Sequence, residues 1–199
     1  MKLILKSVCV AFVLTVILTM LPFEARCGNI SNEIFRLHIL ANSDSQEDQQ
    51  LKLKVRDAVL ERTEELYAKA QTKEEALRLT RINLREIEKT AQETVNACGY
   101  SYPVTARIAN IYFNTRHYDD VTMPSGFYDA LQIEIGSGEG QNWWCVMYPS
   151  LCVGAAADSE ILKKELDDDE MSIVTSEGEF TLRFKLLEYF ESFKNWLYG

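Results

Sequence analysis

A cluster of polar side chains near the start of the chain holds most of the residues whose types could do chemistry. Its members, which can all make directional hydrogen bonds, are Arg36, His38, Asn42, Asp44 and Asp48. On paper, His38 and Asp44 could form a hydrolytic triad with Ser43 or Ser45 as the nucleophile. No Gly-x-Ser-x-Gly elbow accompanies them. We therefore expect a stabilised turn or a recognition surface, with hydrolysis as the alternative.

Metal and nucleotide chemistry find little support in the sequence. The chain has only two histidines, His38 and His117, and no Cys-x-x-Cys pair. The usual ligand spacing of a metal site is therefore missing, and we expect neither a metal nor a cofactor. The run Gly136-x-Gly138-x-Gly140 resembles a phosphate-binding loop, but it lies between two expected strands and opens no helix. We expect a flexible turn there.

Two cysteines in the second half of the chain are close enough for a disulfide. Cys145 and Cys152 enclose a short loop that contains Pro149. In an oxidising compartment they could pair, and closing so small a ring stabilises a fold by about 2.5 kcal/mol. The alternative is two buried free thiols.

The N-terminus has the layout of an export signal. Lys2 and Lys6 precede an apolar run, residues 8–23, and the chain becomes polar again at Glu24 and Arg26. The run is slightly short for a membrane-spanning helix, which needs about 20 residues. We expect residues 1–27 to be a signal peptide or an N-terminal membrane anchor, and a buried core helix is the alternative.

The remainder of the chain is strongly acidic. Without residues 1–27 it carries 18 basic and 29 acidic side chains, a formal charge of −11. Such a surface repels phosphate backbones and anionic lipid headgroups. We therefore expect no nucleic-acid partner, and membrane contact only through the N-terminal segment if it is not cleaved.

Hydrophobic periodicity predicts the elements that position the polar cluster. Residues 34–41 alternate as a strand, with Phe35, Leu37 and Ile39 on the face opposite Arg36 and His38. Two helices follow, over residues 47–70 and from the capping box Thr72-x-x-Glu75 to Gly99. The short link between them predicts an antiparallel pair.

Strand patterns return after the helix pair, over residues 104–113, 127–135 and 143–148. We expect the last two strands to pair as a hairpin, with Trp143 and Trp144 on opposite faces. One indole would lie in the core and the other could be an exposed anchor. The fold class is α+β: an N-terminal strand, an antiparallel helix pair and then antiparallel strands (β-α-α-β-β-β).

The tail is expected to be a separate unit. Residues 155–166 read as a short helix, residues 167–170 as a solvated acidic face or linker, and residues 180–197 as an amphipathic helix. This last helix packs on its own domain or docks to a partner or membrane. We therefore divide the chain after the leader into a domain at 28–157 and an acidic linker with a C-terminal amphipathic helix at 158–199.

Two long motifs resemble a known family. The first is Phe35-Arg36-Leu37-His38-Ile39-Leu40-Ala41-Asn42-Ser43-Asp44-Ser45, followed by Asp48-Gln49 and Leu51-Lys52-Leu53-Lys54-Val55-Arg56-Asp57. The second runs from Pro124-Ser125-Gly126 through Asn142-Trp143-Trp144-Cys145-Val146 to Pro149-x-Leu151-Cys152. Together they resemble the stage II sporulation protein R family over about residues 30 to 155, with small departures at Met123, Ser125 and Ser150.

The resemblance implies a signal exported between forespore and mother cell during endospore formation. It would trigger a membrane-embedded aspartic protease, which processes the precursor of mother-cell sigma factor E. We expect a non-enzymatic activator, with a hydrolase acting on envelope material or a structural module as alternatives. Candidate partner-binding residues are Arg36, His38, Asn42, Asp44, Asp48, Arg116, Trp143 and Trp144.

Overall fold

The computed structural model describes residues 2–118, 121–149, 162–175 and 180–198. Its elements confirm the α+β class and include the expected ones in the expected order, with two additional short strands that form a separate sheet. They are α1 (Lys2–Glu33), β1 (Phe35–Leu40), α2 (Gln46–Tyr67), α3 (Lys73–Ala97), β2 (Val104–Phe113), β3 (Arg116–Tyr118), β4 (Val121–Met123), β5 (Gly126–Ile135), β6 (Asn142–Tyr148), α5 (Asp168–Thr175) and α6 (Thr181–Tyr198).

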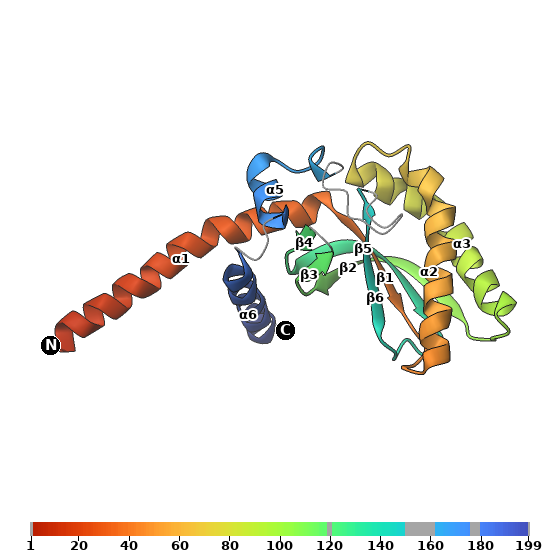
Figure 1. The fold of residues 1–199 in the computed structure, drawn as a ribbon, viewed down its shortest axis with the longest axis horizontal. Coiled ribbons are helices and arrows are strands. Elements are labelled where there is room, and N and C mark those ends of the chain that lie inside the picture. The colour runs from red at the N-terminus through yellow and green to blue at the C-terminus, as the bar shows by residue number, and fades with distance from the viewer. Residues whose placement is uncertain (1, 119–120, 150–161, 176–179, 199) are drawn as a thin grey trace.

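The main sheet has the strand order β2-β5-β1-β6 (Figure 1), so the hairpin predicted for β5 and β6 is wrong. β1 lies between these two strands, parallel to β5 and antiparallel to β6. The physical reason is burial, because β1 is buried on both faces and such a strand needs a neighbour at each edge. The loop from β5 to β6 is long enough to step across the end of β1.

The helix pair covers one face of the sheet (Figure 1). Both helices begin at capped residues: Ser45 accepts from the Asp48 amide and Thr72 from the Glu75 amide. They pack against each other and against the alternate strand residues Phe35, Leu37 and Ile39, as the periodicity predicted. Burial of this apolar surface is the main source of stability here.

The opposite face of the sheet carries a second core. The end of α1 contributes Phe23, Cys27 and Ile30, which pack with residues of β2, β4, β5, β6, α5 and α6. The boundary predicted at residue 27 therefore falls inside a continuous helix. Its segment from Ile4 to Glu33 is long and apolar enough to cross a membrane, a test that both a cleaved signal and a retained anchor pass.

The tail is partly helical. The helix predicted for residues 155–166 falls mostly outside the described residues. The acidic run expected as a linker instead begins α5, where Asp167 accepts a hydrogen bond from the Glu170 amide at 2.8 Å. Acidic side chains at a helix N-terminus are stabilised by the helix dipole, which explains the difference. The C-terminal helix predicted at 180–197 is confirmed as α6.

Candidate partner-binding site

The junction between β1 and α2 is held by side-chain hydrogen bonds. Asp48 accepts from Nδ2 of Asn42 at 2.9 Å and from Oγ of Ser43 at 2.6 Å. Burial alone would raise the pKa of Asp48, but hydrogen bonds from Ser43, Asn42 and Tyr102 outweigh it and lower the pKa. Asp48 is therefore an ionised acceptor at neutral pH, and it fixes the turn.

The same junction binds the loop that joins β5 to β6. Asn42 accepts from the Ser137 amide at 3.1 Å, and Asp44 accepts from the Gln141 amide at 2.7 Å. From α2, Nζ of Lys52 donates to the Gln141 carbonyl at 2.7 Å. We call Asn42, Asp44, Asp48 and Lys52 the junction clamp, because together they hold the loop over the end of β1.

The glycine run is explained by this close approach. A Cβ atom on Gly136, whose φ is +62°, would lie 2.2 Å from Oδ1 of Asn42. A Cβ on Gly140 would lie 2.2 Å from the Ser43 carbonyl oxygen. Only glycine fits at such distances. A turn is present where a flexible one was expected, but the junction clamp holds it, and its glycines let the loop approach the β1–α2 junction.

A row of four side chains crosses the other face of the sheet, and its members lie directly opposite one another in neighbouring strands. Arg107 on β2 is opposite Gln132 on β5, Gln132 is opposite His38 on β1, and His38 is opposite Trp144 on β6. Nε of Arg107 donates to Oε1 of Gln132 at 2.6 Å. Nε2 of Gln132 lies 3.1 Å from Nδ1 of His38. We call these residues the cross-strand row.

The row fixes the tautomer of His38. Because the guanidinium of Arg107 can only donate, the Gln132 amide must accept there and donate through Nε2 to His38. The neutral imidazole then carries its proton on Nε2. Burial lowers the pKa of His38 to about 4, an effect that the Asn142 side chain opposes and the charges of Arg36 and Arg107 strengthen.

Trp144 ends the row and is held from both sides. Its ring stacks on His38, with the centroids 4.3 Å apart and the planes at 18°. The guanidinium of Arg116 lies over the indole, 5.3 Å from its centroid. Arg116 and Arg107 are exposed and Trp144 is half-buried, so the row and the neighbouring Arg116 together present two cations and an aromatic ring at the surface.

Arg36 lies deeper, in an aromatic cage. It is fully buried, with its guanidinium 4.1 Å from the Phe113 centroid and 4.9 Å from that of Tyr128. NH2 of Arg36 donates to the Tyr118 hydroxyl at 2.5 Å, and this hydroxyl in turn donates to the Trp144 carbonyl at 3.3 Å. Cation–π contacts explain how this cation is held. Arg36 thus supports the strand that carries Trp144 and is not itself a surface residue.

The predicted site residues therefore separate into three groups. His38, Trp144 and Arg116 meet at the row, with Arg36 beneath them. Asn42, Asp44 and Asp48 form the clamp. Trp143 is on the opposite face, as its alternation with Trp144 predicted, and it packs in the first core under the Arg56 guanidinium at 4.5 Å. A role of any of them in partner binding stays a prediction.

Sequence reasoning missed Arg107 and Gln132. Both lie in strands that were predicted, but neither belongs to a run of unusual residues, and only the register places them beside His38. The alternation with Leu131 and Ile133 places Gln132 on the polar face of its strand, so its burial, with the residue only 9% exposed, gave no signal in the sequence.

The triad considered from the sequence does not assemble. Ser43 donates to Asp48, Asp44 accepts from Gln141, and Nδ1 of His38 is bound by Gln132, so the three side chains are engaged elsewhere. Within the described ranges no group of three His, Cys, Asp or Glu residues could hold a metal ion. Exposed arginines and aromatic rings are residue types that protein-binding surfaces commonly contain.

Cys145 lies on β6 within the first core and is disulfide-bonded. Cys9, Cys27 and Cys98 are free thiols. Cys152 lies outside the described residues, so the predicted pairing with Cys145 stays a prediction.

Comparison with known proteins decides the family. The sequence profile of Stage II sporulation protein R matches residues 31–158, a region that contains both the clamp and the row. The chain belongs to the stage II sporulation protein R family. A relative in Bacillus subtilis (strain 168), also named Stage II sporulation protein R, is 39% identical over 140 residues. The alignment covers 70% of this chain but only 62% of that relative, less than two thirds of its length.

The stage II sporulation protein R match confirms the resemblance drawn from the two motifs and makes this a sporulation-related protein. No solved structure matches the chain. Most of α1 and the whole of α6 lie outside the matched residues.

Proposed function

We propose that this chain is an exported sporulation signal that activates a membrane-embedded aspartic protease, which then processes the precursor of mother-cell sigma factor E. Membership of the stage II sporulation protein R family is the observation that carries this proposal. The N-terminal helix, which has the length and composition of a signal or anchor, supports export into the space between forespore and mother cell.

The cross-strand row is the surface that we assign to the protease. Tryptophan and arginine are the residues that most often dominate binding energy at interfaces, and here Trp144 lies under the guanidinium of Arg116, with Arg107 at the other end of the row. These cations stand out on a chain whose formal charge is −9. They suit a partner surface that offers carboxylates or backbone carbonyls.

Activation follows if this surface binds the active protease more tightly than the inactive one. A ligand shifts a conformational equilibrium only by its difference in affinity for the two states. If the active protease is a dimer, binding that bridges or favours this dimer is sufficient. The chain then needs no chemistry of its own.

Co-expression tests the proposal. The full chain, the protease and the sigma-factor precursor are produced together, and precursor cleavage is scored with and without the chain. Cleavage that requires both the chain and the catalytic aspartates of the protease supports the proposal. Cleavage that persists without the chain, or that survives loss of those aspartates, contradicts it.

A further inference from the structure

α6 carries an apolar stripe that its own domain does not bury. Leu182 and Tyr189 are each 73% exposed, and Leu186 is 39% exposed. At 100° per residue these three side chains share one face of α6, opposite the face on which Phe184 and Leu187 enter the second core. α6 is therefore apolar on two sides, and only one side is used in folding.

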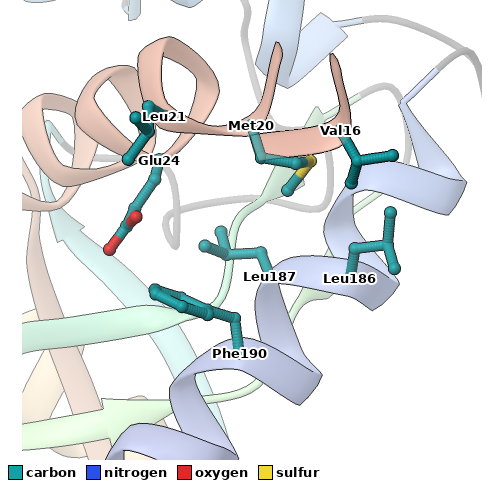
Figure 2. Close-up of a pocket in the computed structure, with 7 residues that line it drawn as sticks. All are labelled: Val16, Met20, Leu21, Glu24, Leu186, Leu187 and Phe190. Atoms are coloured by element: carbon teal, nitrogen blue, oxygen red, sulfur yellow. The ribbon is translucent and has the colours of Figure 1, made fainter. Parts of the chain in front are cut away.

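The stripe continues into a groove between α6 and α1. Figure 2 shows the side chains that line it, and apart from one carboxylate they are all apolar: Val16, Met20, Leu21, Glu24, Leu186, Leu187 and Phe190. The groove has a volume of about 360 Å³. Its apolar wall on α1 belongs to the segment that is long and apolar enough to cross a bilayer.

The contacts of α6 place it at the end of that segment. The start of α6 and the residue before it pack around Phe23. The ring centroid of Phe23 lies 5.7 Å from that of Phe180, on which it stacks, and 5.5 Å from that of Phe184. Phe23 is followed directly by Glu24 and Arg26, the residues at which the sequence turns polar. In Figure 1, α6 runs across α1 rather than along it. If α1 crosses a bilayer, α6 therefore lies at the level of the lipid headgroups.

We propose that α6 rests on the membrane surface beside the point where α1 emerges, with Leu182, Leu186 and Tyr189 inserted among the lipids and acyl chains filling the groove. Aromatic and aliphatic side chains on one face are typical of helices that lie in the interface. Since the chain is acidic, this contact is apolar rather than electrostatic. α1 must stay attached for this arrangement to exist.

Photo-crosslinking in membranes tests the contact. The full chain is reconstituted in phosphatidylcholine vesicles that contain an alkyne-tagged lipid, with p-benzoylphenylalanine placed at Tyr189 or, in a second variant, at Leu182. The same probe at Leu14, an exposed residue within the apolar run of α1, is the positive control. The probe at Lys89, an exposed residue of α3, is the negative control, because α3 packs on the far face of the sheet.

Lipid adducts at Tyr189 and Leu182 should exceed those at Lys89 by about ten-fold and approach those at Leu14. They should change little when anionic lipid is added or salt is raised. Adduct yields at both positions no higher than at Lys89 would overturn the proposal. So would adducts to a second copy of the chain, a strong dependence on anionic lipid, or membrane-bound chain whose mass shows that α1 has been removed.

Discussion

Gly136 lies directly against Asn42: a Cβ atom on the glycine would be 2.2 Å from the amide oxygen of the asparagine. The two residues come from the two sequence motifs, which are far apart in the chain. They meet because the loop after β5 must pass the end of β1 to reach β6. The motifs are therefore two halves of one structural unit.

Replacing Gly136 with alanine should destabilise the fold. The substitution adds a left-handed φ penalty and a collision with Asn42, together about 3 kcal/mol of unfolding free energy. Gly99→Ala is the matched control, because Gly99 has a φ of +85° but nothing within 4 Å of its Cβ position. Gly99→Ala should lower the unfolding free energy by only about 1 kcal/mol. Equal losses in urea unfolding would mean that the contact between loop and junction is not tight.

Acid should weaken the fold through His38. Its pKa is about 4 in the folded chain and about 6.5 when unfolded, so between these values the unfolded chain binds more protons. Stability should therefore fall as the pH decreases from about 6.5 to about 4. His38→Gln replaces the imidazole with an uncharged amide and removes the titration. Its urea midpoint should depend less on pH across this window, and identical pH profiles for the two chains would contradict the assigned burial of His38.

The disulfide is open to a direct test. Peptide mapping without reduction should recover Cys145 joined to Cys152. Cys145→Ser and Cys152→Ser should each lower the unfolding free energy by about 2.5 kcal/mol, and the double variant by no more, because each breaks the same ring. Cys98→Ser, which removes a free thiol, should have little effect. Recovery of Cys145 joined to any other cysteine would refute the pairing.

Local patterns were enough to predict much of the fold. The alternation of Phe35, Leu37 and Ile39 identified β1 and its buried face, and the Thr72 capping box identified the start of α3. Strand order was not predictable in this way. The Gly136–Gly140 turn looked like a hairpin because the sequence does not reveal that a strand from much earlier in the chain lies between β5 and β6.

The candidate site was only partly predictable, because strand order and register bring its residues together. His38 and Trp144 stood out by residue type, but the row that joins them to Arg107 depends on the register of four strands. Asn42 and Asp44 were singled out because they belong to a polar cluster at the strand-to-helix junction. Their contacts with Ser137 and Gln141 come from tertiary packing, which a local pattern cannot indicate.

The most direct test of the central claim is precursor cleavage driven by a chain that carries both Arg107→Ala and Arg116→Ala, beside Arg85→Ala as an exposed control on α3. Loss of interface arginines of this kind typically weakens binding at least about ten-fold. We predict a matching loss of cleavage by the double variant at limiting chain concentration, with the variant still folded at the assay temperature. The control should cleave as the unsubstituted chain does. Full cleavage by a folded double variant would contradict the assignment of this sheet face to the protease.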